Sequence, residues 1–83
     1  MNIFDELIEK GRKTPIGEKL YNILLGFCED KGVIALALNQ LETDEKKQRM
    51  IDYIEKYNIE TDEDVDSLID CIEENREPEI ISE

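Results

Sequence analysis

The sequence has no histidine and no tryptophan, and it has only two cysteines among 83 residues. Histidine is the side chain whose ordinary pKa lies nearest neutral pH, so the chain lacks the usual general base of an enzyme. It also has no glycine-rich phosphate loop and no Gly-x-Ser-x-Gly motif. We therefore expect a protein that is not an enzyme and that uses no cofactor and no metal.

Other absences concern the compartment. There is no apolar run of about 18 residues, so no membrane span is expected. The start of the chain lacks the basic residues and apolar stretch of a signal peptide, which predicts a cytoplasmic protein. Cys28 and Cys71 lie far apart and form no Cys-x-x-Cys motif, so we interpret them as reduced thiols of the core.

Basic residues are scarce in the last third of the chain. Residues 58–83 contain eleven acids and only Arg76 as a base, a net charge of 1 − 11 = −10, whereas residues 1–57 sum to 9 − 11 = −2. The whole chain therefore carries −12, with a pI near 4.3. This acidity argues against direct binding to nucleic acid or to an anionic membrane, because both recruit lysine and arginine. It favours a basic protein partner.

What the sequence does contain is helical periodicity. A chain of this length makes one domain with a small core. We predict an all-α fold: a small compact bundle of four to five short helices over residues 1–77, followed by a flexible acidic tail at 78–83. No strand is expected unless the continuous apolar run 33–38 forms one, and we interpret that run as a short central helix because Ala and Leu favour helix.

Local signals place the first two helices. Apolar residues recur at helical spacing up to Gly11, which predicts a first short helix. Thr14-Pro15 is a helix-start signal, and the apolar face that follows predicts a second helix to about Asp30, closed by Lys31-Gly32.

The C-terminal half contains an internal repeat. Residues 41–58 align with residues 59–76 at an offset of 18, and both copies carry the sequence Glu-Thr-Asp-Glu. Threonine caps a helix and the acids complement its positive end. Leu41 and Ile59 precede these caps and are expected to pack on the first turns. The repeat predicts a helical hairpin of 44–57 and 62–75.

The second helix of this hairpin is the candidate site. On a helical wheel of about 100° per residue, seven carboxylates share one arc beside the apolar stripe. They are Asp62, Glu63, Asp66, Asp70, Glu73, Glu74 and Glu77. Like charges four residues apart cost about 0.2–0.5 kcal/mol per pair, so an unmixed acidic face suggests a binding role beside the alternative of a merely solvated face.

We therefore expect a non-catalytic inhibitor or regulator. Its acidic helix would dock on a basic, nucleic-acid-binding protein, as DNA-mimicking and anti-CRISPR proteins of phages and mobile elements do. This is an analogy of charge and size alone. The alternatives are a degenerate EF-hand-like calcium site at 62–73, with Ser67 where the loop needs glycine, and a homodimer that covers Met50, Tyr53, Tyr57 and the face of 33–38.

Overall fold

The computed structural model describes residues 3–76 and 78, and this part of the chain forms five α-helices and no strand. The helices are α1 (Ile3–Gly11), α2 (Pro15–Leu25), α3 (Lys31–Gln40), α4 (Asp44–Tyr57) and α5 (Asp62–Glu73). The predicted all-α bundle is confirmed, and so is its C-terminal hairpin of α4 and α5. Apart from Pro78, the predicted tail lies outside the described residues.

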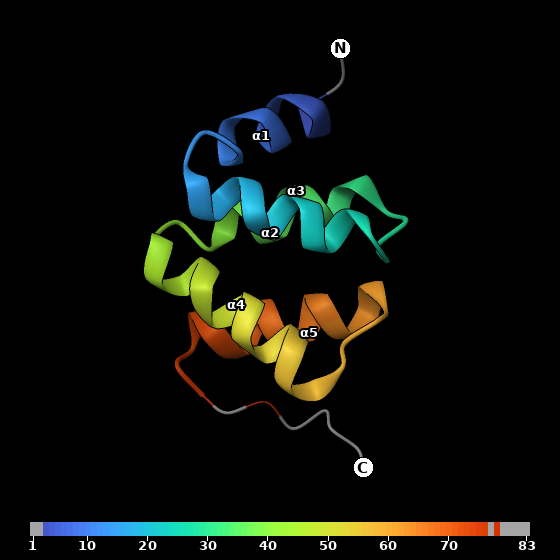
Figure 1. Ribbon diagram of the computed structural model, residues 1–83, viewed down its shortest axis with the longest axis vertical. Helices are drawn as coiled ribbons and strands as arrows, with labels where there is room; N and C mark the ends of the chain where they lie inside the picture. Colours follow the sequence, from blue (N-terminus) through green and yellow to red (C-terminus); the bar gives the residue numbers. More distant parts are fainter. Residues whose placement is uncertain (1–2, 77, 79–83) are drawn as a thin grey trace.

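The helices form three layers along the long axis of the molecule (Figure 1). α1 lies at one end, α2 and α3 form the middle layer, and α4 and α5 form the layer at the other end. α1 packs mainly on α3, while α2 contacts α4 and α3 contacts α5. The molecule measures 39 × 24 × 19 Å, and its middle layer separates α1 from the acidic helix.

The core lies between the middle layer and the α4–α5 layer. Its fully buried large side chains come from α2 to α5 and from the loop before α4: Leu20, Leu24, Leu38, Leu41, Met50, Ile51, Val65, Leu68, Ile69 and Ile72. The first helix contributes one buried side chain, Ile8. Its other apolar residues stay partly or largely exposed, so α1 is the most peripheral helix of the bundle.

Three helices begin at a threonine, as the sequence predicts. The hydroxyl oxygens of Thr14, Thr43 and Thr61 accept hydrogen bonds from the amides of the residues three positions on, at 3.0, 3.2 and 3.1 Å. Each cap satisfies an amide that has no partner within its helix, a contribution of about 1 kcal/mol. The predicted starts of α2, α4 and α5 are confirmed.

The prediction for the end of the second helix is wrong. α2 ends at Leu25 rather than near Asp30, and Lys31-Gly32 begins α3 instead of closing α2. Asp30 is the N-cap of α3, and its carboxylate accepts a hydrogen bond from the Gly32 amide at 2.8 Å. The continuous apolar run 33–38 lies inside α3, so the helical interpretation is confirmed over the strand.

The two repeat copies share one frame. At the offset of 18, buried residues of α4 align with buried residues of α5: Met50 with Leu68, Ile51 with Ile69, and Ile54 with Ile72. Leu41 and Ile59 are both buried, as predicted. The C-terminal ends of the two helices differ. Each helix is followed by an asparagine with left-handed backbone, Asn58 and Asn75, and these lie 17 residues apart instead of the repeat offset of 18. α5 therefore ends at Glu73, two residues earlier than predicted.

Candidate functional site

One side of α5 belongs to the core and the other faces solvent. Its buried residues are Val65, Leu68, Ile69, Cys71 and Ile72. The opposite side carries three of the predicted carboxylates, Glu63, Asp66 and Asp70. Because the helix is anchored by five buried side chains, the carboxylates on its outer side are held in fixed positions along a rigid element.

Three of the seven predicted carboxylates form a single exposed row. Glu63, Asp66 and Asp70 are exposed, and none of them makes an ion pair or a side-chain hydrogen bond with another described residue. Their spacing of three and then four residues places them on neighbouring turns of one helix face. We call these three residues the acidic row.

Asp62 turns towards the body of the protein instead. Its two carboxylate oxygens accept hydrogen bonds from the backbone amides of Glu29 and Asp30, at 3.2 and 3.0 Å. These amides belong to the loop that joins α2 to α3. Asp62 is half-buried, and its role in this structure is to hold that loop.

Two further predicted residues, Glu73 and Glu74, lie at the end of α5. Glu73 is paired with Lys46 of α4 at 3.5 Å, and Glu74 is paired with Arg76 at 2.6 Å. Glu77 lies outside the described residues. The structure thus brings together Glu63, Asp66 and Asp70 as unpaired anions, and it gives Glu73 and Glu74 basic neighbours.

The calcium interpretation finds no support in this geometry. Residues 62–73 are helical throughout, so their carboxylates project along a rod and do not surround one point. Among the described residues, no group of three or more aspartates, glutamates or cysteines is arranged to hold a metal ion.

Comparison with known proteins gives no match. No family model, no curated protein and no solved structure matches this chain. In the described part of the chain, no helix combines the length and the apolar character needed to cross a bilayer.

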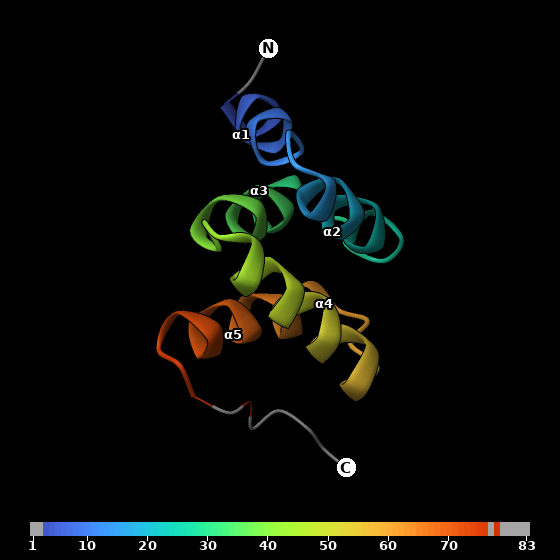
Figure 2. The ribbon, with the colours of Figure 1, turned by 60° about the vertical axis from the view of Figure 1, so that its left-hand side comes forward.

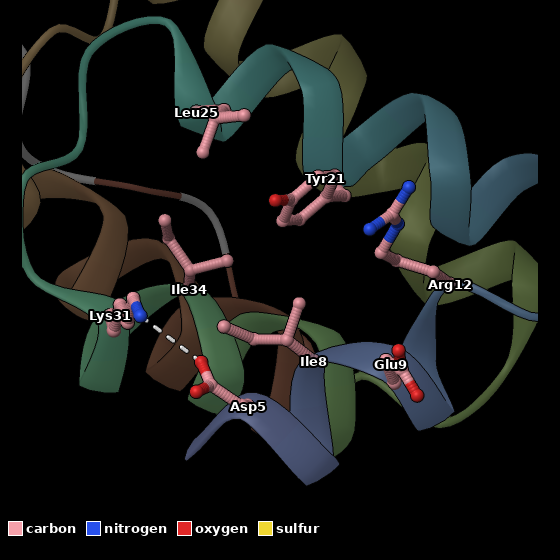
Figure 3. Close-up of a pocket in the computed structure, with 8 residues that line it drawn as sticks. All are labelled: Asp5, Ile8, Glu9, Arg12, Tyr21, Leu25, Lys31 and Ile34. Atoms are coloured by element: carbon pink, nitrogen blue, oxygen red, sulfur yellow. Dashed lines mark hydrogen bonds and ion pairs between the residues drawn. The ribbon is translucent and has the colours of Figure 1, made fainter. Parts of the chain in front are cut away.

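A hollow of about 270 Å³ lies between α1, α2 and α3 (Figure 3). Leu25 and Tyr21 of α2 face Ile8 and Ile34 across it. Three of the charged side chains that line it are paired within the chain: Lys31 with Asp5 at 3.1 Å, and Arg12 with Glu18 at 2.7 Å. Arg12 also lies 4.2 Å from the ring centre of Tyr21. Typical ligand sites have volumes of about 300–1,000 Å³, so this hollow is smaller than most of them. Its paired charged groups are also less available to a ligand.

A buried lysine is the residue that sequence reasoning missed. Lys47 of α4 is 5% exposed, and its Nζ donates a hydrogen bond to the carbonyl oxygen of Leu41 at 2.6 Å. Burial lowers the pKa of its ammonium group, and the nearby carboxylates of Asp44 and Glu42 oppose that shift. The signal was available, because Lys47 occupies the repeat position at which α5 has the buried Val65.

Both cysteines are buried and unbonded, as expected of core thiols. Burial, together with a hydrogen bond to the Asp62 carboxylate, raises the pKa of the Cys28 thiol to about 12. A thiol needs to ionise before it can attack an electrophile. Cys28 is thus held in its unreactive form at neutral pH, and its surroundings do not favour a redox role.

Proposed function

We propose that this protein is a non-catalytic binding module that docks the acidic row of α5 on a basic surface of another protein. The single observation that carries the proposal is the unpaired state of Glu63, Asp66 and Asp70 on one face of an anchored helix. The neighbouring helix α4 mixes Lys46, Arg49 and Lys56 with its acids, so its surface is balanced.

The geometry of the row favours a partner that binds nucleic acid. With a rise of 1.5 Å per residue, consecutive members of the row are about 5 Å apart along the helix axis. A strand of duplex DNA carries one phosphate per about 3.4 Å of axis. A groove lined with lysine and arginine for phosphates would accept such a line of carboxylates. The protein would then act as a competitive inhibitor that imitates the phosphate backbone.

The physics of such an encounter is electrostatic. The row is exposed, so its charges steer association over a distance and are screened by salt. The association rate is expected to fall steeply as ionic strength rises, with a smaller change in the dissociation rate.

The test is a comparative pull-down from a bacterial lysate at low salt. The row variant Glu63→Gln/Asp66→Asn/Asp70→Asn removes three charges from α5. The matched control Glu45→Gln/Asp52→Asn/Glu55→Gln removes three charges from exposed positions of α4 and gives the same net charge.

Support would be a set of nucleic-acid-binding proteins that the wild type and the control retain, that the row variant loses, and that excess duplex DNA releases. If the row variant retains the same proteins as the wild type, the acidic row is not the binding site and the proposal fails.

A further inference from the structure

The exposed apolar side chains gather in the half of the molecule that lies away from α5. Among the residues that the structure describes, the large hydrophobic side chains that remain exposed are Ile3, Phe4, Leu25 and Leu36, at 64, 43, 52 and 39%. All of them belong to α1, α2 or α3. The core of an 83-residue protein is small and cannot bury every apolar side chain. Exposed apolar residues that are scattered are ordinary, whereas a contiguous apolar patch indicates an interface.

Three of these four side chains lie along one flank of the α1–α3 pair. A Cβ placed on Gly32 would lie 3.4 Å from the Phe4 ring, so that ring covers the start of α3. Leu36 follows Gly32 by four residues and lies on the same side of α3. Asn39, three residues further on, donates a hydrogen bond to the carbonyl oxygen of Leu7 at 2.9 Å.

Ile3 precedes Leu7 by one turn and shares its side of α1. Leu25 is separate, because it lines the hollow on the α2 side (Figure 3). We call Ile3, Phe4, Leu7 and Leu36 the apolar flank. Figure 2 shows α2 on one side of the α1–α3 pair and no helix on the other.

Charge decides what can cover this flank. Residues 1–40 contain five bases and six acids, 5 − 6 = −1, whereas residues 41–83 contain five bases and sixteen acids, 5 − 16 = −11. Two copies that meet through α1 and α3 would therefore bring their nearly neutral halves together. Their acidic helices would lie at the far ends of the pair, where mutual repulsion is weakest.

Two of the exposed charges of α1, Glu6 and Lys10, are opposite in sign and can pair between two copies. Glu6 and Lys10 lie one turn apart on the outer side of the helix, and neither is paired with another described residue. In a two-fold arrangement with the α1 helices antiparallel, Glu6 of one copy faces Lys10 of the other, and the pair occurs twice.

We propose that a second copy of this chain covers the apolar flank, and that the protein forms a weak two-fold dimer through antiparallel α1 helices. The flank differs from the surface that the sequence suggested for a dimer, since Met50 and most of the 33–38 segment are core. The inference does not depend on the acidic row, which stays exposed in the dimer.

Sedimentation equilibrium tests the association. For a small interface we expect the average mass to rise from the monomer value of 9.7 kDa towards twice that value over about 5–500 μM protein. Leu36→Lys should keep the protein monomeric over the same range. The matched control Leu25→Lys places the same charge on an exposed leucine outside the flank and should associate like the wild type.

A charge exchange tests the antiparallel arrangement with two exposed residues that the fold does not need. Glu6→Lys and Lys10→Glu should each weaken self-association, because each brings like charges together twice. An equimolar mixture of the two variants restores both opposite-charge pairs and should associate several-fold more tightly than either variant alone.

Three results would overturn the proposal. The first is a wild-type mass that stays monomeric over the whole range. The second is a Leu25→Lys variant that loses association as fully as Leu36→Lys. The third is a mixture that associates no better than its components, which would refute the antiparallel pairing.

Discussion

Asp62 and Asp66 are one turn apart on α5, and helical period alone places them on the same face. Their surroundings differ, because Asp62 receives two backbone amides from the α2–α3 loop while Asp66 faces solvent. Equivalent positions of the repeat also differ. Lys47 is buried like Val65, but its ammonium group donates a hydrogen bond to a carbonyl oxygen. At the scale of single residues, the role of a charge is set by the backbone groups that reach it.

Asp62→Ala is expected to lower the free energy of unfolding by about 1–2 kcal/mol, because two loop amides lose a charged acceptor. Asp66→Ala removes the same charge from the same helix without breaking a hydrogen bond and should change stability by less than about 0.5 kcal/mol. Urea unfolding of both variants measures the difference. Equal losses would show that Asp62 does not hold the loop.

The raised pKa of Cys28 predicts a loss of stability in alkaline solution. The contribution of the protonated thiol is fully present below the pKa of an unfolded cysteine, about 8.5, and is lost as pH rises towards the folded value of about 12. Between pH 8 and pH 10, the free energy of unfolding measured in urea should decline more for the wild type than for Cys28→Ala. Both proteins share their other groups that titrate in alkaline solution, so the comparison isolates the contribution of Cys28. Equal declines in the free energy of unfolding would contradict the prediction.

At the scale of elements, the first two helices owe their arrangement to glycines. α1 ends at Gly11, and a Cβ there would lie 2.5 Å from the Cβ of Leu38 on α3. A Cβ on Gly17 of α2 would overlap the carbonyl oxygen of Gly11. These two positions allow the end of α1 to approach α2 and α3 closely enough for Ile8 to reach the core.

Gly17→Ala is therefore expected to cost about 1–3 kcal/mol, the range for forced overpacking, because the clash is with backbone. Gly26→Ala is the control. Gly26 has a right-handed helical backbone, and its added Cβ would meet only the Ile23 carbonyl oxygen at 3.3 Å. We expect Gly26→Ala to alter stability by less than about 1 kcal/mol. Thermal unfolding of the two variants distinguishes them, and similar melting temperatures would show that α1 adjusts at little cost.

At the scale of the whole molecule, charge and apolar surface are segregated along the long axis. Residues 41–83, which include α4 and α5, carry −11 of the net −12. Among the described residues, the exposed large hydrophobic side chains belong to α1 and to the middle layer of α2 and α3. The middle layer keeps the two ends apart. The two proposed interfaces could therefore be occupied at the same time.

Segregated charge also predicts how salt affects stability. Raising NaCl from about 0.05 to about 0.5 M shortens the screening length from about 14 to about 4 Å. It should raise the melting temperature, because repulsion within the acidic half outweighs its few exposed ion pairs. The row variant Glu63→Gln/Asp66→Asn/Asp70→Asn should gain less from salt. A melting temperature that falls with salt would show that ion pairs dominate instead.

The sequence by itself determined the all-helical fold, the starts of α2, α4 and α5, and the location of the net charge. These follow from contacts within one or two turns, such as a threonine capping an amide three residues away, and local contacts can be read from local sequence. It also identified the repeat frame that places Met50 and Leu68 in the core.

Only the tertiary structure decided where α2 ends, which carboxylates of α5 are unpaired, and that Lys47 is buried. For the carboxylates of α5, the deciding atoms are distant in sequence: Asp62 accepts hydrogen bonds from amides 32 and 33 residues earlier, and Glu73 meets a lysine 27 residues earlier. Lys47 is buried by packing between helices, which places it where α5 has a valine. Such contacts cannot be inferred from periodicity, so the sequence alone could not show that Asp62 and Glu73 have partners while Glu63, Asp66 and Asp70 have none within the described part of the chain.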